Sequence, residues 1–367
     1  MSGRRLHSLA AWLAMTGGGL GIVLAFYVAA HAWEHSRLPF PANLGNARAA
    51  ALLAQRPDPA ERLKFAIVGD INNGVETFEA VIARLREEKD VSFLLLLGDC
   101  AADPNPHLHD YFVREFAETG LALPTFIVAG NHDVDAGKFD YTQFESLYGP
   151  ANFSFRFHGD LFVGLGGLHT PQKRRETLAF LEHTLRDARP AVRRIYVFMH
   201  FAPTAASGIP TDGFDDSTEF QALLETYRVN YVFSGHYHRL ARTEVNGVVY
   251  LVSGGGGARL RYDQFEDIGL FHHLTLIEAG NGVTSEHIIP IPPASLVAQG
   301  LEHHVERFAL TVLVPAFGSA PLLCGLMGLA GTGALAWGVS VLWRQRRRGS
   351  RRPGRTHDRA PDARVPE

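Results

Sequence analysis

The stretch PTFIVAGNHDV, residues 124–134, joins a short apolar run to a row of three polar residues. Its apolar part, rich in β-branched and aromatic residues, is typical of a buried strand. Directly after Gly130 come Asn131, His132 and Asp133, which offer an amide, an imidazole and a carboxylate. Taken alone, such a tetrapeptide is an ordinary polar turn, because Gly, Asn and Asp favour turns. Its meaning therefore depends on how the other strands of the chain end.

Four other predicted strands also end in residues of metal-binding type. Their ends read Gly69-Asp70-Ile71-Asn72, Gly98-Asp99, Met199-His200 and Gly235-His236-Tyr237-His238. In open α/β sheets functional side chains collect at the carboxyl ends of strands, and a preceding Gly lets the backbone turn sharply there. We therefore expect these ends and residues 130–133 to share one cleft.

The side chains that this cleft collects suit a pair of divalent metal ions. Two carboxylates, two amides and four imidazoles supply the oxygen and nitrogen donors that Zn, Mn and Fe accept, without a thiolate. Two ions about 3.5–4 Å apart need a bridging carboxylate and several further ligands. A single Asp or His of this kind is more often a strand cap or a structural histidine than a ligand. Five strand ends in series favour the metal site over that structural alternative.

The middle of the chain reads as a mixed α/β domain with two sheets, covering residues 63–290. Strand-then-helix order in its first half indicates parallel pairing, while closely spaced strands at 153–166 and 240–289 indicate hairpins. The predicted strands lie at 64–69, 92–98, 124–130, 153–157, 161–165, 194–199, 231–235, 248–253 and 272–278. The predicted helices lie at 75–88, 110–118, 141–148, 173–187 and 217–227.

Two long uncharged segments flank this domain and predict membrane helices. Residues 1–34 form an expected N-terminal transmembrane anchor. Residues 308–343 form an expected C-terminal transmembrane segment, whose spanning part we place at 321–343 because Pro315 and Pro321 interrupt the run. Residues 35–62 and 291–307 are expected linkers, and residues 344–367 an expected basic cytoplasmic tail.

Arginine residues lie outside both apolar segments, on the sides away from the middle domain. By the positive-inside rule they place both termini in the cytoplasm, so that the middle domain faces the periplasm, outside the cytoplasmic (inner) membrane. The alternative for the first segment is a cleaved signal peptide, because Ala30-His31-Ala32 resembles a cleavage site. Either alternative sends the middle domain across the membrane. Cys100 and Cys324 are the only cysteines, so no disulfide framework is expected.

The five strand ends, in this order, resemble the signature of the calcineurin-like metallophosphoesterases. That signature runs Asp-x-His, Gly-Asp, Gly-Asn-His-Asp or Glu, His, then Gly-His-x-His. The resemblance implies an α/β fold, a four-layer αββα sandwich of two mixed sheets with a two-metal site at one edge. It also implies that one ion is held by Asp70, Asp99 and His238, and the other by Asp99, Asn131, His200 and His236. His132 would then stabilise the phosphoryl group or protonate the leaving oxygen, and Asp133 would orient its ring.

One position departs from the family pattern. The second residue after the first Asp is usually His, and here it is Asn72. An amide oxygen is a weaker ligand than imidazole for Zn or Fe. If Asn72 is a ligand, three consequences are left open. The first metal site binds its ion more weakly, prefers a harder ion such as Mn, or takes up its ion only together with substrate.

The expected function is that of a membrane-anchored, metal-dependent phosphohydrolase. A water held between two divalent ions, of Mn, Fe or Zn, loses a proton near neutral pH, and the hydroxide can attack the phosphorus of a phosphomonoester or phosphodiester. The tether suggests a lipid-linked or cell-envelope substrate, so the expected partners are a phosphoester and the membrane. The alternative is a binding or scaffold protein that kept this fold and lost turnover. No basic, aromatic-lined groove indicates nucleic acid as a partner, and the sequence leaves the oligomeric state open.

Overall fold

The computed structural model describes residues 3–35, 37–57, 62–168, 171–203, 217–260, 269–292, 305, 307–316 and 319–349. The chain divides into two compact units. One comprises Arg37–Thr311, and the other comprises Met1–Ser36 together with Val312–Glu367.

The first sheet of the large unit has five strands in the order β11-β10-β1-β2-β3. Strands β1, β2 and β3 are parallel, and β10 runs antiparallel to β1 and to β11. The buried apolar character of β1 and β2 fits strands covered on both faces. The strand bounds are Leu63–Val68 for β1, Val91–Leu96 for β2, Thr125–Ile127 for β3, His273–Gly280 for β10 and Val283–Pro290 for β11.

The second sheet has six strands in the order β4-β5-β6-β7-β9-β8. Strands β5, β6, β7 and β9 are parallel, while β4 and β8 are antiparallel strands at the two edges. Both sheets are therefore mixed, as the sequence predicts. The strand bounds are Asn152–Phe157 for β4, Asp160–Leu165 for β5, Ile195–Met199 for β6, Tyr231–Ser234 for β7, Leu240–Val245 for β8 and Val248–Ser253 for β9.

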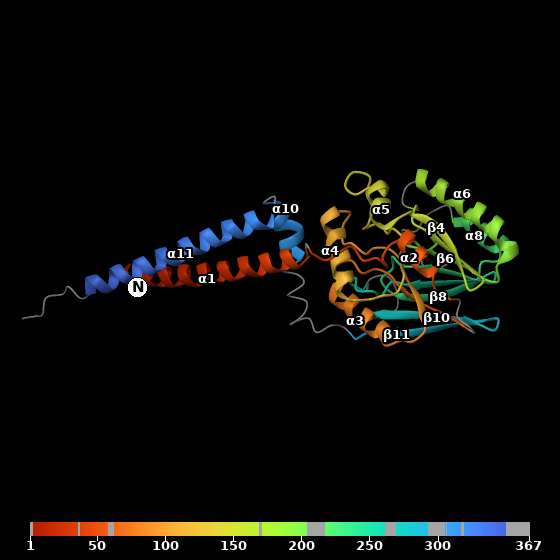
Figure 1. Cartoon of the computed structure of the whole chain (residues 1–367), viewed down its shortest axis with the longest axis horizontal. Helices are drawn as coiled ribbons and strands as arrows, with labels where there is room; N and C mark the ends of the chain where they lie inside the picture. The colour runs from red at the N-terminus through yellow and green to blue at the C-terminus, as the bar shows by residue number, and fades with distance from the viewer. Residues whose placement is uncertain are drawn as a thin grey trace, which may run out of the picture. The chain divides into compact units, whose positions relative to one another are not determined.

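Helices cover the outer face of each sheet (Figure 1). The first sheet packs against α3 (Val75–Arg86), α4 (Pro106–Glu118) and α5 (Tyr141–Tyr148), whose buried faces share one apolar cluster with it. The second sheet packs in the same way against α6 (Pro171–Ala188) and α8 (Ser217–Thr226). With a third cluster between the sheets, the layers follow the order αββα, which confirms the predicted fold.

Aromatic side chains fill the space between the two sheets. Phe65 on β1 stacks on Phe93 of β2 with ring centroids 5.2 Å apart, and Phe162 of β5 meets Phe93 edge-on at 5.0 Å. All three are fully buried. Burial of each such ring stabilises the fold by roughly 1.5–3 kcal/mol, and the edge-on pairs add to this. The aromatic layer holds the two sheets face to face and so fixes their strand ends relative to each other.

Part of the expected linker 35–62 belongs to the large unit instead. Helix α2 (Asn46–Leu53) packs against the sandwich with Ala49 and Leu53 buried. The Asn46 amide accepts from Ile127 N at 2.9 Å and donates to Ile127 O at 2.9 Å, which pairs the backbone of edge strand β3. Residues 46–53 are therefore part of the folded domain and not of a linker. The Ala- and Pro-rich composition of the segment gives no indication that the Asn46 amide is buried and hydrogen-bonded. Most of the second expected linker, 291–307, lies outside the described residues.

The second unit is a pair of long helices, α1 (Gly3–His35) and α11 (Ala320–Gly349). They approach closely at Gly18 and Gly331: a Cβ added at Gly18 would lie 2.6 Å from Gly331 O. Ser8 Oγ also donates to Gln345 Oε1 at 2.6 Å. Small residues at such a crossing are typical of helix packing in membranes. The short helix α10 (Val314–Ala316) precedes α11.

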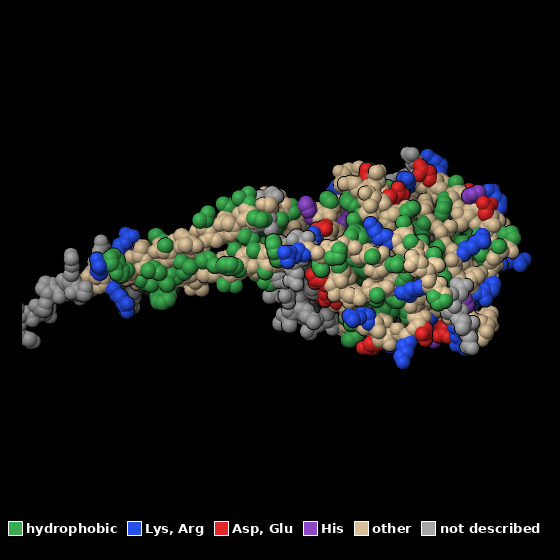
Figure 2. Space-filling view, in the orientation of Figure 1, with side chains coloured by type: hydrophobic (Ala, Val, Ile, Leu, Met, Phe, Trp, Pro, Cys, Tyr) green, Lys and Arg blue, Asp and Glu red, His purple; other side chains and the backbone are tan. Residues whose placement is uncertain are grey.

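Both long helices contain a segment apolar and long enough to cross a bilayer, Leu6–Ala30 and Pro321–Arg347. Within an apolar stretch of 18 residues in each segment only 17% is buried, unlike in a core helix of a soluble protein. Hydrophobic side chains cover the helix pair, and Lys and Arg gather at the end where α11 finishes (Figure 2). These features indicate membrane association. The basic tail is described as far as residue 349, where α11 ends.

Candidate metal centre

The parallel strands bring the five predicted strand ends to one edge of the sandwich. Asp70 and Asp99 follow β1 and β2, His200 follows β6, and the Gly-His-Tyr-His run follows β7. Asp70 Oδ1 accepts from the backbone N of His236 at 3.0 Å, which joins the two sheets at this edge. The strand ends that the sequence predicts to lie together thus meet from both sheets.

The backbone turns sharply where these side chains enter the site. Left-handed φ values are uncommon outside Gly and cost about 1–3 kcal/mol each, and they concentrate at functional sites. Here such φ values occur at Asp70 (59°), Asn72 (48°), Asp99 (54°), His236 (71°) and His238 (47°). The aromatic layer and helices of the sandwich supply the stability that holds these turns.

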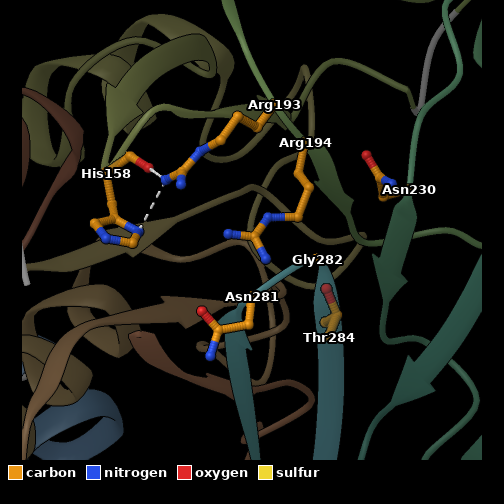
Figure 3. Close-up of a pocket in the computed structure, with 7 residues that line it drawn as sticks. All are labelled: His158, Arg193, Arg194, Asn230, Asn281, Gly282 and Thr284. Atoms are coloured by element: carbon orange, nitrogen blue, oxygen red, sulfur yellow. Dashed lines mark hydrogen bonds between the residues drawn. The ribbon is translucent and has the colours of Figure 1, made fainter. Parts of the chain in front are cut away.

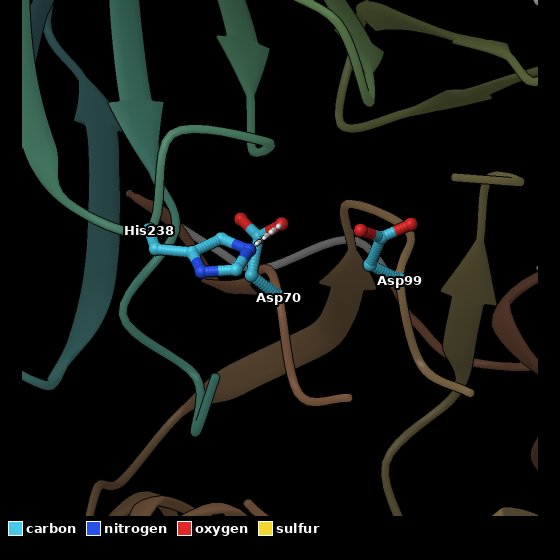
Figure 4. Close-up of side chains that lie close together, drawn as sticks. All are labelled: Asp70, Asp99 and His238. Atoms are coloured by element: carbon cyan, nitrogen blue, oxygen red, sulfur yellow. Dashed lines mark ion pairs between the residues drawn. The ribbon is translucent and has the colours of Figure 1, made fainter. Parts of the chain in front are cut away.

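One group of possible ligands consists of Asp70, Asp99 and His238 (Figure 4). All three residues are buried, and one ligand atom of each lies within 4.8 Å of the others. His238 Nε2 is 3.7 Å from Asp70 Oδ1. Two carboxylates beside an imidazole in a buried position suit a divalent cation, which compensates their charge.

A second group meets around His200 Nε2. Its neighbours are Asn131 Oδ1 at 3.0 Å, His236 Nδ1 at 3.3 Å and Asp99 Oδ1 at 3.4 Å, and Asn131 Oδ1 is also 3.0 Å from His236 Nδ1. Ligands bonded to one metal at about 2.1 Å lie roughly 3.0 Å apart in an octahedron and roughly 3.4 Å apart in a tetrahedron. These atoms therefore have the spacing of one coordination shell. Asp99 belongs to both groups, the position of a bridging carboxylate.

Backbone carbonyls fix the orientation of two imidazoles. His200 Nδ1 lies 2.9 Å from Leu97 O, and His238 Nδ1 lies 2.7 Å from Arg259 O. A carbonyl oxygen only accepts, so Nδ1 carries the hydrogen in each ring and Nε2 is the atom available to a metal. Such contacts behind the ligand set its tautomer and raise its basicity.

Asn72 is hydrogen-bonded through its backbone to Asp99, the residue that belongs to both groups. Its backbone N donates to Asp99 O at 2.8 Å. Its side-chain Oδ1 is buried and has no hydrogen-bond partner among the described residues. A buried amide oxygen without a donor is costly unless a cation or water satisfies it. This orphaned atom fits a role as a weak oxygen ligand.

Asp133 does not orient the ring of His132 in this structure. Its carboxylate accepts from four backbone N–H groups, at 2.7–3.0 Å, and these belong to Asp99, Cys100, Ala101 and Gly130. The His132 ring is held instead by Ala102 O, 2.9 Å from Nδ1, while His132 N donates to Asp99 Oδ1 at 2.9 Å. Asp133 therefore holds the turn that carries Asp99, because its carboxylate accepts hydrogen bonds from successive backbone N–H groups of that turn.

Asp99 and His200 each shift the pKa of the other. Although burial alone would raise the pKa of Asp99, the neighbouring His200 holds it well below its usual range. Burial alone would lower the pKa of His200, but the Asp99 carboxylate raises it to about 9. A metal ion binds the neutral imidazole, so a cation here takes the place of the His200 proton.

Two kinds of supporting group escaped the sequence analysis. The first is His109, fully buried in α4, which lies 2.8 Å from Asp133 O and 3.0 Å from the Tyr148 hydroxyl. A lone His inside an amphipathic helix gives no signal of this kind. The second is the set of carbonyls behind the imidazoles, which any residue type can supply.

Clustered Asp, Asn and His side chains at the strand ends of a mixed sandwich suit a class of proteins that bind divalent metal ions. Residues 63–240 match the family model of the calcineurin-like phosphoesterases. A serine/threonine-protein phosphatase of Bos taurus is 30% identical over 229 residues, which cover 55% of this chain and 73% of that protein. A probable cyclic nucleotide phosphodiesterase of Rhodopseudomonas palustris is 28% identical over 218 residues, 56% of this chain and 73% of that protein. The chain belongs to the calcineurin-like phosphoesterase family.

Among solved structures, a dimetal phosphatase from Danio rerio has a TM-score of 0.47 and 13% identity, covering 62% of this chain and 99% of that one. By its family the chain is a hydrolase that acts on phosphoester bonds, and Asp70, Asp99 and His238 form a possible metal-binding triad in it.

Proposed function

We propose that this chain is a membrane-anchored phosphohydrolase that uses two divalent ions, of Mn, Fe or Zn. Asp70, Asp99 and His238, with Asn72, would hold one ion. Asp99, Asn131, His200 and His236 would hold the other. The spacing of 3.0–3.4 Å around His200 Nε2 carries the proposal, because four ligand atoms from four strand ends converge there at the separations expected around one divalent cation.

Two bound divalent ions would supply the chemistry by acidifying a water and neutralising the phosphate oxygens. The protein's own groups do the rest. His132 is fixed by Ala102 O through Nδ1, which leaves Nε2 for the phosphoryl group or the leaving oxygen of a phosphomonoester or phosphodiester. Asp133 holds the turn that positions Asp99.

The membrane anchor supports a substrate in or near the bilayer, such as a lipid-linked phosphate or cell-envelope precursor. Arg307 immediately precedes the C-terminal apolar segment, and its Nη1 donates to Asn73 O at 3.4 Å, next to Asn72. The proposed centre and the start of that segment are thereby linked within the large unit. We also propose that α1 is a retained anchor, since its Gly18 packs on Gly331 of α11, and that the arginines keep both termini in the cytoplasm and the catalytic unit in the periplasm.

The test uses the full chain in nanodiscs, stripped of metal and then reconstituted with Mn²⁺, Fe²⁺ or Zn²⁺. Hydrolysis of a chromogenic phosphomonoester and phosphodiester is measured beside Asp99→Asn and the control Asp103→Asn, an exposed Asp paired with Lys138. We expect turnover that Asp99→Asn lowers by about 10³-fold or more and Asp103→Asn leaves unchanged. Metal binding without turnover of either ester would instead favour a binding or scaffold protein of this fold.

A further inference from the structure

A second concavity lies at the end of the sandwich opposite the proposed metal centre. It has a volume of about 770 Å³ and is lined by His158, Arg193, Arg194, Asn230, Asn281 and Thr284 (Figure 3). Arg193 and Arg194 come directly before β6, whereas His200 comes directly after it. Six residues of extended strand span roughly 20 Å, so this cavity, the distal pocket, is separate from the metal centre.

The distal pocket has an excess of positive charge. Arg194 Nε and Nη2 each lie 3.0 Å from Asp160 Oδ2, and Asp160 is fully buried. Arg193 Nε is 3.7 Å from the other oxygen of the same carboxylate, and its side chain is 58% exposed. One carboxylate thus faces two guanidinium groups. Since Asp160 also fixes Arg194 in place, little conformational entropy is lost when that side chain binds a ligand.

The remaining groups that line the pocket are mainly hydrogen-bond donors. Asn230 Oδ1 already accepts from Ile195 N at 2.9 Å, so its unused atoms are amide N–H groups. Arg193 donates to the His158 carbonyl, and Arg194 Nη1 makes only a long contact of 3.4 Å to Val283 O. None of the described residues that line the pocket is acidic. In Figure 3 the arginine side chains and Asn281 reach toward the same space between the strand ends and the hairpin of β10 and β11.

We propose that the distal pocket binds the phosphate group of a small phosphorylated molecule. Asp160 engages Nε and Nη2 of Arg194, which leaves Arg194 Nη1 and the exposed Arg193 guanidinium to donate to phosphate oxygens. Such charge-assisted bonds are among the stronger ones in proteins. The volume falls in the range of about 300–1,000 Å³ typical of small-molecule sites and exceeds what a lone phosphate needs. The site is independent of turnover at the metal centre and would serve to hold a ligand rather than to cleave it.

The test measures phosphate binding with the metal centre disabled. The full chain carrying Asp99→Asn is stripped of metal with chelator in nanodiscs, and inorganic phosphate and glycerol 3-phosphate are titrated by calorimetry in about 0.15 M chloride. We expect saturable binding at one site per chain, with glycerol 3-phosphate binding more tightly. If inorganic phosphate binds equally well, the ligand is free phosphate and the proposed small phosphorylated molecule is wrong.

Three variants locate the binding. Arg193→Ala removes an exposed side chain and is expected to weaken binding at least about tenfold. Arg194→Lys keeps the charge opposite buried Asp160 but loses the fork of donors, so it is expected to weaken binding several-fold. Arg175→Ala removes an exposed arginine from α6 and should change nothing. Absence of saturable binding, or equal affinities of Arg193→Ala and Arg175→Ala with unchanged melting temperatures, would overturn the proposal.

Discussion

Asp133 shows how a single carboxylate can support a site without touching a ligand. It is fully buried, and burial together with the nearby Asp99 charge raises its pKa, whereas hydrogen bonds from backbone N–H groups act in the opposite direction by stabilising the carboxylate. The turn after β2 owes its shape to these bonds. Any change in Asp133 is therefore transmitted to Asp99, the residue that we propose as the bridge between two metals.

The change Asp133→Asn tests this role. An amide has one acceptor oxygen, and its NH₂ group would face N–H donors, so at least two bonds are lost in a buried place. We expect the free energy of unfolding to fall by about 2–4 kcal/mol, with weaker metal binding, measured by urea denaturation and metal titration. Asp135→Asn is the control, because Asp135 is exposed and an amide can still accept from Gly137 N. Equal stabilities of the two variants would contradict the role.

The raised pKa of His200 predicts how metal affinity depends on pH. Its pKa of about 9 exceeds the ordinary value of about 6.5, so in the metal-free chain the proton stabilises the fold fully below about pH 6.5, and this stabilisation is lost as the pH rises through 9. Binding of a divalent ion must displace the proton. We expect release of about one proton per chain at pH 7.5 and an affinity that rises about tenfold per pH unit up to about 9.

Calorimetry of Mn²⁺ binding in buffers of different ionisation enthalpy measures this proton release. His200→Asn should abolish the released proton, whereas His107→Asn, an exposed histidine at the start of α4, should not. A metal affinity that stays constant between pH 7 and pH 9 would contradict the displacement of a His200 proton by the metal.

At the scale of the element, glycines at the strand ends make room for the carboxylates. A Cβ added at Gly235, after β7, would lie 2.6 Å from Asp70 Oδ2, closer than real contacts allow. Gly235→Ala should therefore displace Asp70 and lower metal affinity at least about tenfold, at a cost of about 1–3 kcal/mol in stability. In Gly137→Ala the nearest atom is at an ordinary 3.4 Å, so metal affinity should be unchanged. Metal titration of both variants distinguishes a site effect from general destabilisation.

Most elements of the sandwich could be predicted from periodicity, and the exceptions share a physical reason. All five predicted helices are present, with ends shifted by a few residues. The separate strand list named neither β8 nor β11, whose sequences LARTEV and VTSEHIIP are polar and half-exposed at sheet edges. An edge strand pairs its backbone on one side only and leaves many of its side chains exposed. Its sequence therefore contains fewer apolar residues from which a strand can be predicted. The helix α2 was missed because it has only eight residues, and its buried face consists of Asn46, Ala49 and Leu53, which is too short a pattern to stand out in an Ala-rich segment.

At the scale of the whole molecule, the helix pair predicts a retained N-terminal anchor. Cysteines introduced at Ser8 and Gln345, whose side chains are hydrogen-bonded, should form a cross-link between α1 and α11 in membranes. Gly18→Val should reduce it strongly, because its side chain would meet Gly331 O, whereas Gly19→Val has open space and should not. The Cys324→Ser background avoids a competing thiol. A mature chain that lacks residues 1–32 by mass spectrometry would show a cleaved signal peptide instead.

The sequence by itself determined the order of the strand ends, the residue types that they carry and the two apolar segments. These follow from local patterns: the apolar runs, the glycines before polar residues and the spacing of His236 and His238. Only the tertiary structure decided what each side chain contacts. Asp133 meets four N–H groups rather than His132, the rings of His132, His200 and His238 rest on carbonyls of Ala102, Leu97 and Arg259, and the distal pocket joins residues far apart in the chain. Backbone groups are the same at every residue, so the sequence cannot name them as partners until the fold has brought them together.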